Sequence, residues 1–141
     1  ERITMLDNLV ELIVFTPRGS FSADPDFGFE YWSHEYTNVN AMQFNNNNTG
    51  RDHYSKESAK MRCQESIRQS LQTYAPELKD VEVTMNLEAA EAGMQGSKKV
   101  LSRYVVYITV EGSIDDGLGT TCAYQKDVVF LIEPTSKRVS I

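Results

Sequence analysis

Residues 62–85 read RCQESIRQSLQTYAPELKDVEVTM, and within them the spacing of apolar side chains changes from helical to extended. Up to Tyr74 the apolar residues recur every three or four positions, which predicts an amphipathic helix. From Val81 onward apolar and polar residues alternate, as in a β-strand with one buried face. Pro76 lies between the two patterns, and proline disfavours continuation of a helix. We therefore expect a helix to end here and a strand to follow.

The same two spacings divide the rest of the chain. Apolar steps of three and four predict a first helix over residues 3–15, which Pro17 ends. Alternation predicts further strands near residues 104–110 and 122–132, with a glycine-containing loop over residues 89–99 before the first of these. Helices thus precede strands. This order predicts an α+β fold, with a mainly antiparallel C-terminal sheet packed against two amphipathic helices.

The composition is that of an ordinary globular domain. The chain has 141 residues, of which 40% are hydrophobic and 24% charged, so we expect a single domain over residues 1–141. Within it, a polar Asn-rich loop is expected at about residues 43–54. The net charge of −6 argues against sequence-independent binding to nucleic acid or anionic membrane, since both need cationic patches. No apolar run reaches the length of a membrane span, so no membrane insertion is expected.

Residues suited to metal binding or catalysis are sparse. Two histidines and two cysteines lack the spacing of a zinc site, so we predict no metal site and no cofactor. Cys63 and Cys122 lie in apolar segments and are expected to be small buried side chains. Five carboxylates cluster in the sequence, and glycoside hydrolysis uses two carboxylates at a defined separation. Capping of turns is the commoner role of such residues, so no catalytic residue is predicted. The five are Glu11, Asp24, Asp26, Glu30 and Glu35.

Residues 15–32, FTPRGSFSADPDFGFEYW, hold an unusual density of proline, glycine and aromatic residues. Asp24 to Gly28 has the chemistry of a tight turn, because Pro fixes φ and Gly allows a positive φ. Phe27 and Trp32 are expected to close the end of the core beside this turn. Arg18 is expected either to bind an anion or a partner's carboxylate, or to be an exposed loop residue.

These segments resemble the small baseplate wedge proteins of contractile phage tails and the TssE subunit of type VI secretion systems. In that family the first helix leads into a glycine loop and then a proline-aromatic-glycine turn, and a later helix closes with a Glu-Pro-Arg triplet before a strand. The matching residues here are Thr16, Gly19, Pro25, Phe27, Gly28 and Pro76. Ala75 replaces the glutamate of the triplet, and Glu77 replaces its arginine, which weakens the part of the resemblance that concerns docking to wedge subunits.

The resemblance implies a structural role in a baseplate, with wedge and sheath proteins as partners and no small-molecule substrate. It further implies that an edge strand accepts a strand from a neighbour, and that the protein acts in the bacterial cytoplasm or in a phage virion. We favour the secretion-system version over the phage tail. Two alternatives remain: a peptidoglycan-cleaving acidic lysozyme using Asp24, Asp26 or Glu30, and a regulatory anti-adaptor of the same fold. The predicted partner-binding residues are Thr16, Pro17, Arg18, Gly19, Pro25, Phe27, Gly28, Pro76 and Glu77.

Overall fold

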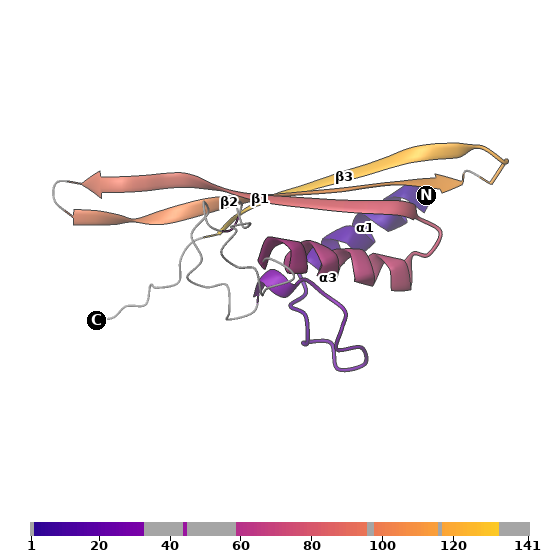
Figure 1. Ribbon diagram of the computed structural model, residues 1–141, viewed down its shortest axis with the longest axis horizontal. Helices are drawn as coiled ribbons and strands as arrows, with labels where there is room; N and C mark the ends of the chain where they lie inside the picture. Colours follow the sequence, from indigo (N-terminus) through magenta and orange to yellow (C-terminus); the bar gives the residue numbers. More distant parts are fainter. Residues whose placement is uncertain (1, 33–43, 45–58, 96–97, 116, 133–141) are drawn as a thin grey trace, which may run out of the picture.

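The computed structural model describes residues 2–32, 44, 59–95, 98–115 and 117–132, and in these residues the predicted α+β order is confirmed (Figure 1). Helices precede strands along the chain. The elements are α1 (Arg2–Val14), the short 3-10 helix η1 (Glu30–Trp32), α3 (Ala59–Tyr74), β1 (Lys79–Gln95), β2 (Lys98–Asp115) and β3 (Thr121–Ile132).

The three strands form one antiparallel sheet in the order β1-β2-β3, so β2 is central and β1 and β3 are the edges. The register pairs Met85 with Ile108, and Ile108 with Val128. All three side chains are buried, because side chains directly opposite one another lie on the same face. The alternation of the sequence therefore sets which face of the sheet meets the core.

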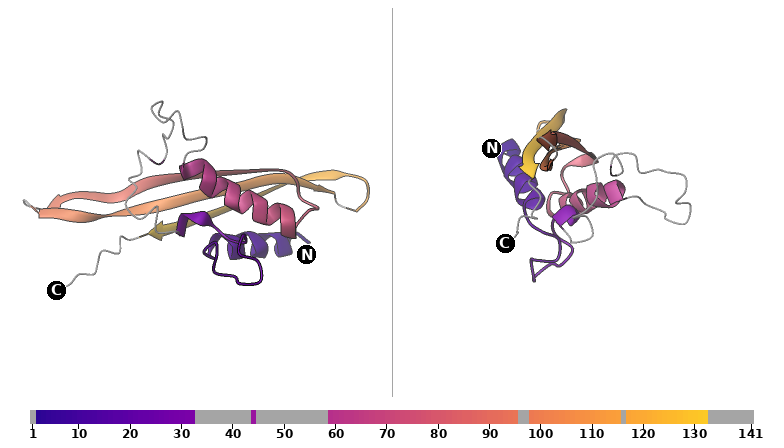
Figure 2. Two further views of the ribbon diagram at one scale, coloured as in Figure 1. Left: turned by 60° about the horizontal axis from the view of Figure 1, so that its bottom comes forward. Right: turned by 90° about the vertical axis from the view of Figure 1, so that its left-hand side faces the viewer.

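Both helices pack on the same face of the sheet, called here the inner face, with α3 against β1 and α1 against β3 (Figure 2). The core lies between this face and the two helices. It is built from the apolar stripe of each helix and the alternate residues of each strand. Its largest fully buried side chains are Phe29, Phe44, Ile13, Ile67, Leu71, Met85, Leu87, Ile108, Val10, Val14, Val106 and Val110.

The prediction of a loop over residues 89–99 is wrong for most of this segment. β1 continues to Gln95 and β2 starts at Lys98, so the hairpin extends well past the helices and past the end of β3 (Figure 1). Backbone pairing between two strands does not require apolar side chains. From the apolar residues near Met85 the ladder continues through a segment that lacks apolar alternation, with register shifts between Ala89 and Glu91 and between Glu91 and Gly93.

Three further expectations concern the Asn-rich loop, the two cysteines and membrane insertion. Phe44 lies inside the expected Asn-rich loop yet is buried, with its ring 5.7 Å from that of Tyr31. The rest of that loop lies outside the described residues. Cys63 is buried as expected, whereas Cys122 is exposed, because it is the second residue of an edge strand and has a neighbouring strand on one side only. In the described part of the chain, no helix is long and apolar enough to cross a membrane.

Candidate functional site

Residues 15–32, here called the corner, are closed by backbone hydrogen bonds between their two ends. The N–H of Phe29 donates to the carbonyl of Thr16 at 2.8 Å, and the N–H of Arg18 donates to the carbonyl of Phe29 at 3.2 Å. These bonds join Pro17 and Phe29 in a short parallel bridge. The chain therefore leaves α1, makes an excursion of about ten residues and returns beside its starting point.

The excursion ends in the predicted turn. The N–H of Phe27 donates to the carbonyl of Asp24 at 3.0 Å, and the N–H of Asp26 donates to the Asp24 carboxylate at 3.1 Å. Such side-chain acceptors are typical of aspartate at the start of a turn. Pro25, between the two aspartates, is exposed.

Gly28 is required by its surroundings. Its φ is +122°, a backbone conformation that residues with a side chain rarely adopt. In addition, a Cβ placed on Gly28 would lie 2.5 Å from the carbonyl oxygen of Thr16. The closure of the corner therefore brings the backbone of Thr16 into the space that any other side chain would need.

Aromatic rings brace the corner on both sides. The buried ring of Phe27 meets the ring of Tyr74, on α3, edge to face at 5.2 Å. The indole N–H of Trp32 donates to the carbonyl of Val14 at 2.8 Å, and its ring stacks on Phe130 of β3 at 5.7 Å. The corner is thus attached to both helices and to the sheet.

Ser66 and Ser70 attach the corner to α3, and sequence reasoning missed both. The hydroxyl of Ser70 accepts the N–H of Gly28 at 3.0 Å, and that of Ser66 accepts the N–H of Glu30 at 2.9 Å. Both serines are buried. A signal was available, because two small polar residues four positions apart interrupt the apolar stripe of α3 next to Cys63 and Ile67.

Arg18 is engaged within its own chain. Its guanidinium contacts the carboxylates of Asp26 and Glu30, each at 3.1 Å, and Glu30 also lies 3.7 Å from Arg62 of α3. Arg18 is exposed, as one of its two expectations had it, and it also pairs with carboxylates of its own chain. The guanidinium links the turn to η1, and thereby orders the corner.

Of the clustered carboxylates, Asp26 and Glu30 share Arg18, whereas Asp24 and Glu11 have partners of their own. Asp24 accepts a hydrogen bond from the hydroxyl of Tyr74 at 2.6 Å, and this bond raises the pKa of Tyr74. Glu11 pairs with Lys126 of β3 at 2.9 Å, and Glu35 lies outside the described residues. Asp24 and Asp26 both line a surface hollow of about 340 Å³ against α3. Asp24 is half-buried and the Asp26 side chain is 80% exposed, so the two are not buried together.

Pro76 and Glu77 follow the end of α3 and are exposed. The N–H of Leu78 donates to the carbonyl of Ala75 at 3.0 Å, which closes a tight turn before β1. Because Tyr74 contacts Phe27 and Asp24, this turn lies near the corner. The two segments that carry the resemblance, 44 residues or more apart in the sequence, therefore meet in one region.

Within the described residues, no group of three or more histidine, cysteine, aspartate or glutamate side chains is placed to hold a metal ion. Comparison with known protein families and with curated proteins finds no match for the chain.

Proposed function

We propose that this protein is a non-enzymatic structural subunit in the baseplate of a contractile injection machine, similar to the TssE subunit of type VI secretion systems. In this role it binds wedge and sheath proteins. One observation carries the proposal: the corner and the turn after α3, which hold the residues of the resemblance, are folded against each other through Phe27, Tyr74 and Asp24.

The nine predicted partner-binding residues differ in exposure. Phe27 and Gly28 are buried, so they hold the shape of the corner, and Thr16 is half-buried. The other six are exposed: Pro17, Arg18, Gly19, Pro25, Pro76 and Glu77. A braced loop that presents exposed backbone and proline rings suits protein recognition, because little conformational entropy is lost when a partner binds. Under the proposal, the exposed group contacts the wedge.

The test is a pull-down with the tagged full chain from a native lysate of the source cells. We expect wedge and sheath subunits to be recovered. Glu77→Lys should reduce recovery of the wedge subunits at least several-fold, since it reverses a charge beside Pro76. Glu111→Lys, at an exposed position of β2, is the matched control and should leave recovery unchanged. Recovery of a protease adaptor without sheath subunits would instead favour the anti-adaptor alternative.

The hollow beside α3 favours a second candidate, a peptidoglycan hydrolase, because Asp24 and Asp26 both line it. A general acid needs a buried, apolar setting, and the exposure of Asp26 speaks against that role. Purified protein is therefore expected not to clear peptidoglycan. Clearing that is lost in Asp24→Asn or Asp26→Asn would support the hydrolase and contradict the structural proposal.

A further inference from the structure

The face of the sheet opposite the helices is called here the outer face, and no helix of the described residues covers it (Figure 1). Its side chains alternate along each strand with the buried ones. The register therefore sets which of them lie side by side, in rows that cross the sheet from β1 to β3. The rows are Glu82, Glu111 and Gln125; Thr84, Thr109 and Asp127; Asn86, Tyr107 and Val129; and Glu88, Val105 and Leu131.

Apolar side chains gather at one end of the outer face. Tyr107 lies opposite Val129, and Val105 lies opposite Leu131. Side chains directly opposite each other on paired strands are close enough to touch, so these four form one patch. Tyr107, Val129 and Leu131 are 39%, 56% and 49% exposed. Contiguous exposed apolar side chains, unlike scattered ones, mark a surface that binds something.

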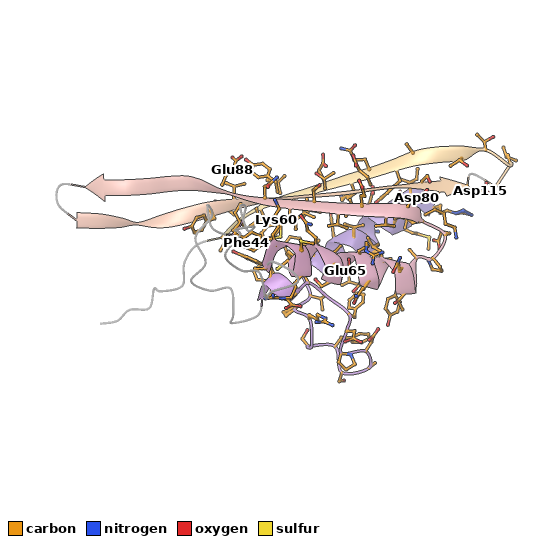
Figure 3. The ribbon with its side chains drawn as sticks, in the orientation of Figure 1. Phe44, Lys60, Glu65, Asp80, Glu88 and Asp115 are labelled. Atoms are coloured by element: carbon orange, nitrogen blue, oxygen red, sulfur yellow. The ribbon has the colours of Figure 1, made fainter. Side chains whose placement is uncertain are left out.

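The rest of the outer face is acidic. It carries four exposed carboxylates, Glu82, Glu88, Glu111 and Asp127, and Figure 3 shows Glu88 on the side of the sheet away from α3. Glu82 and Glu111 lie directly opposite each other, an arrangement that is unfavourable for like charges. Asp127 is bonded to a neutral donor, the hydroxyl of Thr109 at 3.0 Å. Within the described residues, none of the four forms an ion pair.

The helix side of the sheet treats its carboxylates differently. There Glu11 pairs with Lys126 at 2.9 Å, and Glu65 pairs with Arg68. Two basic residues border the outer face, but neither neutralises it. Nζ of Lys60 donates to the side chain of Asn86 at 3.1 Å, and Lys79 lies opposite Ser113, beyond the rows. The unpaired carboxylates are thus concentrated on the one face that the chain leaves uncovered.

The charge of the outer face decides what can bind there. A second copy of the chain would place carboxylates against carboxylates, which is unfavourable. Nucleic acid and anionic membranes have the same sign of charge and are disfavoured too. A complementary surface has basic groups at the acidic end and apolar groups at the other. Tyr107 and Glu111 are four residues apart on β2, so these two sets of groups are separated by about 13 Å.

We propose that the outer face binds a protein partner whose surface carries lysine or arginine about 13 Å from an apolar patch. Val129 and Leu131 pack against that patch, and the basic groups lie between Glu82 and Glu111, where they relieve the repulsion of this pair. The inference goes beyond the proposed function. The wedge contact proposed there belongs to the corner, on the helix side of the sheet, so changes at Glu111 leave it intact.

The test uses the purified full chain and a synthetic helical probe peptide of alanine, leucine and lysine. Leucines occupy two turns of one face of the peptide and lysines the next two turns, which gives the required separation. We expect the probe to shift the methyl NMR signals of Val105, Val129 and Leu131. The signals of the buried Val83 and Val110 should stay unchanged. A peptide with glutamate in place of lysine should bind at least about tenfold more weakly.

Variants of the chain separate binding from folding. Glu82→Gln combined with Glu111→Gln should weaken binding of the lysine probe at least about tenfold. The midpoint of its urea unfolding should be no lower than that of the unaltered chain, because the like-charge pair is removed. Val129→Thr keeps the shape of the side chain but makes it polar, so it should weaken binding several-fold. Glu77→Gln, in the exposed turn after α3, is the control and should bind normally.

Three results would overturn the proposal. The first is the absence of methyl shifts on the outer face with the lysine probe, and the second is equal binding of the two peptides. The third is a dimer in sedimentation whose formation shifts the same methyl signals, because a second copy would then occupy the face. None of these results depends on recovery of wedge or sheath subunits, so each is distinct from a failure of the proposed function.

Discussion

At the scale of the residue, the conformation of the turn depends on Gly28 for two reasons. The sequence predicts a glycine with positive φ here, and the structure confirms it at +122°. The sequence does not reveal the second constraint, the Thr16 carbonyl that occupies the place of a side chain. That contact depends on a residue twelve positions away, beyond the reach of local turn chemistry.

Gly28→Ala should therefore destabilise the fold by at least ~3 kcal/mol, since strain at positive φ adds to a clash with backbone. Gly19→Ala is the matched control in the same loop. Its φ is +95°, but nothing lies within 4 Å of an added Cβ, so a cost of only ~1–2 kcal/mol is expected. Urea denaturation of both variants gives the comparison. Equal losses of stability would show that the contact with Thr16 has no effect.

At the scale of the element, α3 performs three separate tasks with different faces. Cys63, Ile67 and Leu71 pack into the core. Ser66 and Ser70 hold the corner, and Gln64 binds the edge of β1. The sequence predicts the first task, because periodicity is a local property of the chain. The other two join α3 to residues 21 to 42 positions away, and no pattern within the helix identifies those partners.

Ser70→Ala tests the attachment of the corner to α3. The substitution leaves the buried N–H of Gly28 without an acceptor, so a loss of ~1–3 kcal/mol in the free energy of unfolding is expected. Thr73→Ala, at an exposed position one turn further on, should change the same quantity by less than ~0.5 kcal/mol. Thermal unfolding followed by circular dichroism measures both. A loss in Ser70→Ala no larger than that in Thr73→Ala would contradict the role given to Ser70.

At the scale of the whole molecule, a run of aromatic rings joins the N-terminal half to the sheet. Phe29 contacts Tyr31 and Trp32, Tyr31 contacts Phe44, and Trp32 stacks on Phe130. Helix–strand order and the antiparallel sheet were predictable, because both depend on spacing along the chain. The length of the β1–β2 hairpin and the burial of Phe44 were not, since both depend on contacts formed only after the chain has folded.

This aromatic run makes stability depend on pH in the alkaline range. Burial, with a smaller contribution from Cys63, raises the pKa of Tyr31 from 10.0 to about 12. Because the folded-state pKa lies above the unfolded value, the contribution to stability is present below pH 10 and is lost as the pH rises toward 12. We expect the free energy of unfolding to fall by roughly 1 kcal/mol between pH 9 and 11 from this group. Denaturation of Tyr31→Phe should show a correspondingly shallower decline, and an identical decline would exclude Tyr31 as the cause.

Trp32 is the single tryptophan of the chain, and it lies where α1, η1 and β3 meet. The tryptophan fluorescence of the chain therefore reports on one place alone, the contact of Trp32 with Val14 and Phe130, here called the joint. Stacking on Phe130 and the bond to Val14 keep the indole partly shielded from water, so release of the joint would shift its emission to longer wavelength. Titration of the unlabelled protein with a binding partner would then report, optically and without any added dye, whether assembly tightens or loosens this joint.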